Sequence, residues 1–174
     1  MHGDARRNDR MTIEMKNELL NLPSLQLKMD TIVFENIDTK PNWSKAFEQL
    51  DQLLHKVANN FNDYVAKNNG ELPSSTTYWT LYMDIASKLL YFTGLAHANL
   101  LAEDDVDARA HVIKLYELSA SCIPNAHIEN NEELLSEIQK SIHHLNGEEV
   151  NLTVADNVEQ CIKAFKQFAE SYEK

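Results

Sequence analysis

Histidines that follow a carboxylate by one helical turn are the first candidates for chemistry in this 174-residue chain. His55 comes four residues after Asp51 and seven after Glu48. His111 follows Asp107 at the same four-residue spacing. Such spacings place the side chains along one side of an α-helix, where imidazole and carboxylate groups could bind a metal inside a bundle. The Glu-x-x-His pairs of di-metal bundles do not occur in the sequence. We therefore favour solvated pairs on helix faces.

His97 and the two cysteines are the other candidates. On a helix, His97 would share a face with Met83 and Leu90, where a neutral imidazole needs a hydrogen-bond partner. We interpret it as a core histidine. Cys122 and Cys161 fall at apolar positions, are too few for a disulfide framework, and indicate a reducing compartment. The sequence contains no glycine-rich phosphate loop and no nucleophile motif, so it predicts no catalytic residue, cofactor or metal ligand.

The elements that must position these residues are helical. Only four glycines and four prolines interrupt the chain, and apolar residues recur between them at gaps of three and four. The pattern predicts an all-α fold, an antiparallel, up-down helical bundle of about five main helices. Residues 1–10 are expected to be a disordered leader and 11–174 a single domain. Within that domain we expect an N-terminal arm over 11–40 and the bundle over 42–174, with helices near 42–69, 75–102, 105–123, 130–146 and 154–172.

Each expected helix has an apolar face. The second is apolar nearly all round, as a central helix is, and its later half is rich in small residues such as Gly94 that allow close approach. For the last helix we expect a cap at Asn151 or Thr153. The arm is ambiguous, since 11–22 could be helical while Leu25, Leu27 and Met29 alternate as in a strand. The expected inward residues of the third helix are Val106, Ala110, Ile113, Tyr116, Ala120 and Ile123.

Charge is concentrated in one part of the chain. With 16 Lys and Arg against 27 Asp and Glu, the formal charge is −11, which argues against binding to nucleic acid or to anionic membranes. Residues 100–150 carry three basic and eleven acidic side chains, a net charge of −8. Two acidic clusters, expected at opposite ends of an antiparallel helix pair, are Glu103, Asp104, Asp105 and Asp107, and Glu129, Glu132, Glu133 and Glu137. A preference of acidic residues for helix starts is an alternative explanation of this pattern.

These observations favour a non-enzymatic intracellular protein–protein interaction module: an adaptor, inhibitor or immunity-type protein. Its eight clustered carboxylates would bind another protein with a basic surface. Two alternatives remain open, a metal-binding or enzymatic bundle that uses the histidine–carboxylate pairs, and an acidic mimic of nucleic acid. The sequence shows no signal peptide and no membrane span, so we expect a cytoplasmic location, with secretion lacking an N-terminal signal as the alternative.

Overall fold

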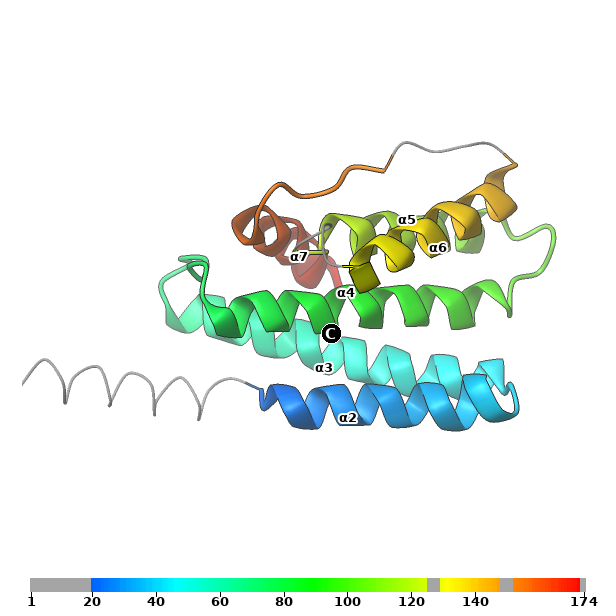
Figure 1. Ribbon diagram of the computed structural model, residues 1–174, viewed down its shortest axis with the longest axis horizontal. Helices are drawn as coiled ribbons and strands as arrows, with labels where there is room; N and C mark the ends of the chain where they lie inside the picture. The colour runs from blue at the N-terminus through cyan, green and yellow to red at the C-terminus, as the bar shows by residue number, and fades with distance from the viewer. Residues whose placement is uncertain (1–19, 125–128, 148–151, 173–174) are drawn as a thin grey trace, which may run out of the picture.

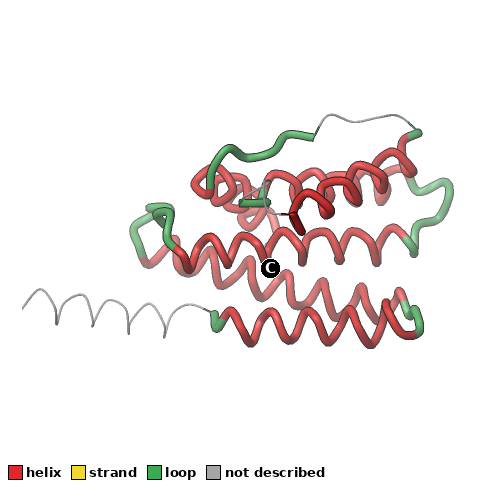
Figure 2. Tube along the Cα trace, in the orientation of Figure 1, coloured by secondary structure: helices red, strands yellow, loops and turns green. Residues whose placement is uncertain are grey.

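A computed structural model describes residues 20–124, 129–147 and 152–172. These residues form six α-helices and one π-helical stretch, with no strand among them, which confirms the all-α prediction. Helices α2 to α5 alternate in direction (Figure 1), and short loops join most of the helices (Figure 2). The bounds are α2 Leu22–Val33, η1 Phe34–Thr39, α3 Trp43–Lys67, α4 Thr77–Ala98, α5 Val106–Ser121, α6 Glu129–Asn146 and α7 Val158–Tyr172.

Five helices begin at a side chain that accepts a hydrogen bond from the backbone N–H three residues later. These caps are Asn21, Asn42, Thr76, Asp105 and Asn157. The predicted cap of the last helix was wrong: Thr153 precedes α7 by several residues, and Asn151 lies outside the described residues. Asn157 is the cap of α7, and Gln160 supports it through a second hydrogen bond. The Gln160 N–H donates to Asn157 Oδ1, and the Gln160 side chain accepts from the Asp156 N–H at 2.9 Å.

The N-terminal arm is helical where the structure describes it, so the strand interpretation was wrong. Leu25 and Met29 are buried one turn apart, whereas Leu27 is 67% exposed. Alternating apolar residues therefore do not share one face here, because α2 packs on α3 and α4 and buries positions four residues apart. The first part of the arm, 11–19, lies outside the described residues.

The larger of two hydrophobic cores, the main core, joins α2, α3, α4 and α7 and includes Leu115 of α5. Phe61 of α3 makes edge-on contacts with Trp79 of α4 and Phe165 of α7, at centroid distances of 5.9 and 5.2 Å. Tyr82 of α4 is also buried, and its hydroxyl donates to the Val57 carbonyl at 3.2 Å. Four helices pack around α4, which confirms its prediction as the central helix, although it ends at Ala98 rather than near 102.

The second core lies between the later half of α4, α5 and α6. Its buried residues are Tyr91, Val112, Tyr116, Ala120, Ile123, Ile138 and Ile142. Two residues predicted to point inward, Val106 and Ala110, are exposed. The face of α5 that packs between α4 and α6 is centred on Val112, Tyr116 and Ser119, and the first turn of the helix projects beyond it.

Gly94 allows the predicted close approach between α4 and α5. The neighbour that approaches is a side chain rather than a backbone, since a Cβ at position 94 would lie 3.1 Å from Cε1 of Tyr116. Tyr116 is itself buried and stands beside Tyr91, with ring centroids 5.8 Å apart. Glycine at this position therefore lets the Tyr116 ring pack closely against the central helix.

Candidate functional site

The first predicted cluster forms an exposed turn between α4 and α5, which we call the acidic turn: Glu103, Asp104, Asp105 and Asp107. Asp105 Oδ1 caps α5 by accepting from the Ala108 N–H at 3.0 Å. The guanidinium of Arg109 donates to the backbone carbonyl of Glu103 at 2.6 Å. Within the described parts of the chain, no Lys, Arg or His forms an ion pair with these four carboxylates. The turn therefore presents four exposed carboxylates without ion-pair partners in this part of the structure, while the Arg109 guanidinium binds its backbone.

Two large apolar side chains are exposed beside the acidic turn. Leu100, just after α4, is 44% exposed, and Val106, the first residue of α5, is 68% exposed. Leu100 precedes the four carboxylates in the sequence, and Val106 lies between Asp105 and Asp107. Apolar side chains inside a polar rim are typical of protein interfaces, where contact area comes from the apolar groups and specificity from the charges.

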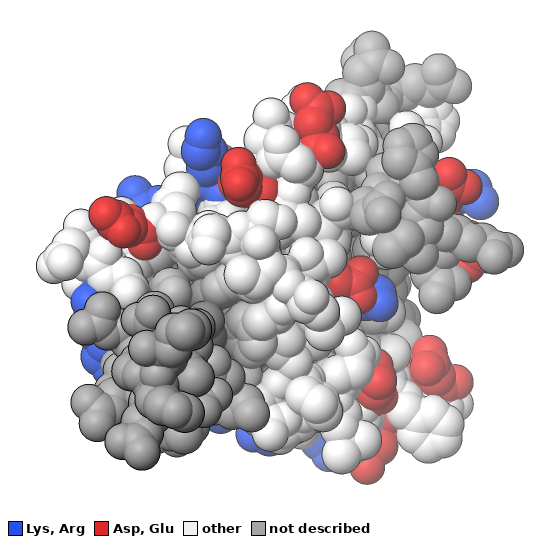
Figure 3. Space-filling model, turned by 60° about the vertical axis from the view of Figure 1, so that its left-hand side comes forward, with Lys and Arg blue, Asp and Glu red and all other residues white. Residues whose placement is uncertain are grey.

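The second predicted cluster, the α6 acidic cluster, is Glu129, Glu132, Glu133 and Glu137. Glu132, Glu133 and Glu137 are exposed, and the Glu129 side chain lies outside the described residues. Glu137 Oε1 is 3.7 Å from Lys140 Nζ. Because α5 and α6 run in opposite directions (Figure 1), this cluster begins at the end of the pair away from the acidic turn. On the face in Figure 3, acidic side chains form separate groups between uncharged areas.

His55 and Asp51 form the predicted pair on a helix face, but the pair is only partly exposed because it belongs to a contact between α3 and the end of α7. His55 Nδ1 donates to the Tyr172 carbonyl at 2.9 Å, and the His55 ring stacks on the Tyr172 ring at 4.0 Å. Nε2 lies 3.5 Å from Asp51 Oδ2, and the Tyr172 hydroxyl donates to Asp51 Oδ1. Burial and the Asp51 carboxylate raise the pKa of Tyr172, so its hydroxyl stays protonated and remains a donor. Glu48 is exposed.

This contact satisfies backbone groups that a helix end leaves open. The last carbonyls of an α-helix have no partner within the helix. His55 binds the carbonyl of Tyr172, and Asn62 Nδ2 donates to the carbonyl of Ala169 at 2.8 Å. Polar residues of α3 therefore hold the C-terminal turn of α7 in place. The sequence did not indicate this role, because the partners are more than one hundred residues apart.

His97, near the end of α4, contacts side chains of α3 and α5. Its ring is 4.7 Å from Phe47 and 5.8 Å from His111, measured between centroids. Its Nδ1 is buried and has no hydrogen-bond partner among the described residues, contrary to the expectation for a core histidine. Burial and the nearby His111 lower the pKa of His97, while Asp51 and Asp105 act in the opposite direction. The expected Asp107–His111 pair does not form an ion pair in the described structure.

The two cysteines are the remaining candidates for chemistry. Cys122 and Cys161 are buried free thiols, and Cys122 Sγ lies 3.8 Å from the Cys161 carbonyl. Burial raises the pKa of Cys122 well above its usual value and that of Cys161 to about 11, so both stay neutral.

No group of three or more His, Cys, Asp or Glu among the described residues is arranged to hold a metal ion. Among the same residues, no helix has the length and apolar character to cross a bilayer.

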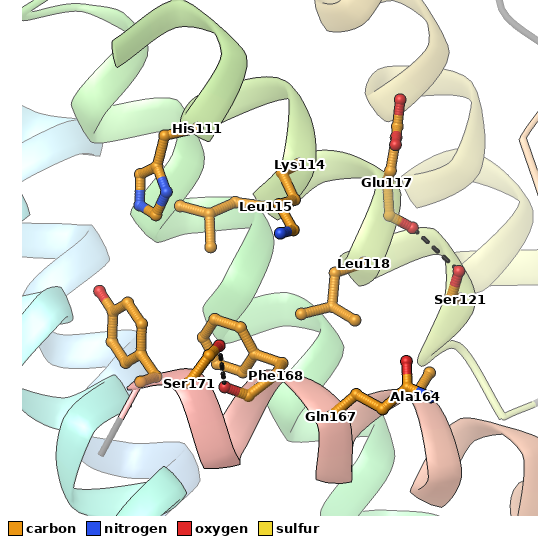
Figure 4. A pocket seen from close by; sticks show the side chains of 11 residues that line it. His111, Lys114, Leu115, Glu117, Leu118, Ser121, Ala164, Gln167, Phe168 and Ser171 are labelled. Atoms are coloured by element: carbon orange, nitrogen blue, oxygen red, sulfur yellow. Dashed lines mark hydrogen bonds between the residues drawn. The ribbon is translucent and has the colours of Figure 1, made fainter. Parts of the chain in front are cut away.

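Two surface depressions were not predicted, since each is lined by helices distant in the sequence. The α5/α7 pocket has a volume of about 630 Å³ and is lined by residues between His111 and Ser121 and between Ala164 and Tyr172 (Figure 4). The α2/α3 groove, of about 540 Å³, has the exposed Leu27 with Ile32 and Leu53 as its apolar lining. The apolar spacing within each helix predicted neither, because both depend on how two helices pack.

Comparison with known proteins adds no relative. No protein-family model matches the chain, and searches of curated proteins and of solved structures gave no match either. The class that fold and surface define is an all-α helical bundle with an exposed acidic turn.

Proposed function

We propose that this protein is a non-enzymatic interaction module that binds a basic protein partner through the acidic turn. The supporting observation is that its four exposed carboxylates lack ion-pair partners in the described structure and stand beside exposed Leu100 and Val106. Unneutralised charge steers a basic partner during diffusion, and the apolar side chains supply contact area once it arrives. The net charge of −11 would also attract a basic partner over longer distances.

The α6 acidic cluster has a secondary part in this proposal. Glu132 lies in the first turn of α6, where negative charge complements the helix dipole, Glu133 follows it, and Glu137 pairs with Lys140. None of the large exposed apolar side chains found in the described structure belongs to α6. The cluster would strengthen the attraction of a basic partner without forming the centre of the contact.

The proposed biological role is that of a cytoplasmic adaptor, inhibitor or immunity-type protein. The two buried free thiols, Cys122 and Cys161, fit a reducing compartment. A nucleic-acid mimic would need carboxylates spaced along a continuous ridge. The separate acidic groups in Figure 3 and the opposed positions of the two clusters favour a local protein contact instead.

The test compares two variants with the same change in charge. One carries Glu103→Lys, Asp104→Lys and Asp107→Lys and keeps Asp105, the cap of α5; the other carries Glu132→Lys, Glu133→Lys and Glu137→Lys. Both and the wild type are immobilised, captured proteins are identified by mass spectrometry, and the dissociation constant of each is measured at low and high salt. We expect a basic partner whose affinity falls at least tenfold with the first variant and far less with the second.

Val106→Ala is the companion variant for the apolar part of the contact. Because Val106 is 68% exposed, its removal should leave the circular dichroism spectrum and the unfolding temperature unchanged while weakening the complex several-fold. If every captured protein binds the wild type and the acidic-turn variant equally well, the proposal is wrong.

A further inference from the structure

The α5/α7 pocket combines an apolar floor with a cationic side. Leu115 and Leu118 of α5 point toward α7, and Phe168 of α7 points back toward them (Figure 4). Ala164 leaves room beside Phe168. The volume of about 630 Å³ lies within the range of roughly 300–1,000 Å³ that small-molecule sites occupy. An apolar group of a ligand would therefore be removed from water here.

The charged groups at this pocket differ from those of the chain as a whole. Lys114 and His111 extend from α5 on the side of α7, whereas the Glu117 carboxylate is directed away from α7 (Figure 4). The Lys114 ammonium forms no ion pair within the described structure. A neutral imidazole still offers one N–H donor. Although the chain has an excess of acidic residues, Glu117 is the single acid among the described residues that line this pocket, so the pocket offers a cation and further donors.

One end of the pocket is held rigidly. Tyr172 lines it, and its side chain is held by the hydrogen bond to Asp51 and by stacking on His55. Phe168 stacks on Tyr172 at 4.7 Å. A wall that is already ordered loses little conformational freedom when a ligand binds, which favours affinity.

We propose that the α5/α7 pocket binds an amphiphilic anion, with its apolar chain on Leu118 and Phe168 and its carboxylate at Lys114 and His111. The apolar floor disfavours a purely ionic ligand, and the unpaired ammonium favours a negative head group over a positive one. The pocket is more enclosed than the α2/α3 groove, which suits a narrow chain better than a protein surface. This site is independent of the acidic turn, so either proposal can fail alone.

The test uses two probes with the same twelve-carbon chain, dodecanoate and dodecyltrimethylammonium, each below its micelle concentration. Each is titrated into uniformly ¹⁵N-labelled full-length protein, and amide shifts are followed. We expect dodecanoate to cause saturable shifts in residues 111–121 and 164–172, with an affinity at least fivefold higher than that of the cation. Absence of saturable shifts in these segments, or equal affinity for both probes, overturns the proposal.

Variants locate the head group and the chain. Lys114→Met should weaken dodecanoate binding about two- to fivefold, the range of an exposed charge pair. Lys56→Met, which removes a lysine of the α2/α3 groove, is the matched control and should leave the affinity unchanged. Ala164→Trp should fill the pocket and abolish binding. Since Lys114 is exposed, its variant folds even if Ala164→Trp does not, and equal effects of the two lysine variants would refute the assigned head-group position.

Discussion

The main core and the second core differ in size and in what they support. The main core is built on aromatic residues from three helices, Phe61, Trp79, Tyr82 and Phe165, and it also buries residues of α2. The second core is smaller and contains the buried side chains of α6, Ile138 and Ile142. The α6 acidic cluster stands on a helix of the second core, whereas the acidic turn leads into α5, which also contributes Leu115 to the main core. Regions with fewer buried contacts open at lower free-energy cost, so we expect α6 to be the more adaptable part of the molecule.

Phe61→Ala should have the largest effect, because Phe61 is fully buried and contacts aromatic rings on two other helices. We expect the free energy of unfolding to fall by about 3–5 kcal/mol, the usual cost of such a cavity. Urea unfolding followed by circular dichroism measures it. A loss below about 1 kcal/mol would mean that the main core does not dominate stability.

Ile142→Ala probes the second core and should act more locally. We expect a loss of about 2–3 kcal/mol, since Ile142 is fully buried on α6. Hydrogen exchange should speed up for amides of α6 and remain nearly unchanged for those of α3. Equal acceleration in both helices would show that the two cores unfold as one unit and do not differ in local stability.

Gly94→Ala tests the contact between the central helix and Tyr116. Alanine favours a helix by about 1 kcal/mol over glycine, but the added Cβ would lie 3.1 Å from a buried ring that has little room to move. We expect the clash to prevail and the free energy of unfolding to fall by about 1 kcal/mol in thermal or urea unfolding. A more stable variant would show that Tyr116 shifts easily.

The smallest expected effect is a pH dependence that involves His97, which lies where α4 meets α5. Its pKa is lower in the folded state than the usual 6.5, so the unfolded chain binds the proton more readily. Its contribution to stability is complete above about pH 6.5 and is lost as the pH falls through the folded pKa. His97→Gln should remove this loss. Asp51 and Asp105 oppose it, and solvent screens the partly exposed ring, so the effect is small.

Urea unfolding of wild type and His97→Gln at pH 7.5 and 5.5 measures this difference. The advantage of the wild type over the variant should decrease toward the lower pH, since carboxylates elsewhere affect both proteins alike. An advantage that stays constant or grows would contradict the lowered pKa.

Local patterns predicted most of the helices but not their faces in every case. The Asn69 and Gly70 backbone has φ values of +58° and +81°, as the predicted end of the first long helix requires. Asp105 caps α5 through a local hydrogen bond to the Ala108 N–H. Leu27 and Val106 were misplaced, because which apolar residues become buried depends on neighbouring helices, and a single helix carries no information about where those neighbours lie.

The sequence alone therefore determined the helical class, the turns, the central position of α4 and the separation of charge into two clusters. Helix periodicity, capping and dipole effects act over a few residues, so they can be read locally. Tertiary structure decided that His55 supports the end of α7, that Arg109 binds the backbone of the acidic turn rather than a carboxylate, and that α5 and α7 enclose a pocket. Each of these depends on residues brought together by packing, or on a side-chain conformation that spacing does not specify.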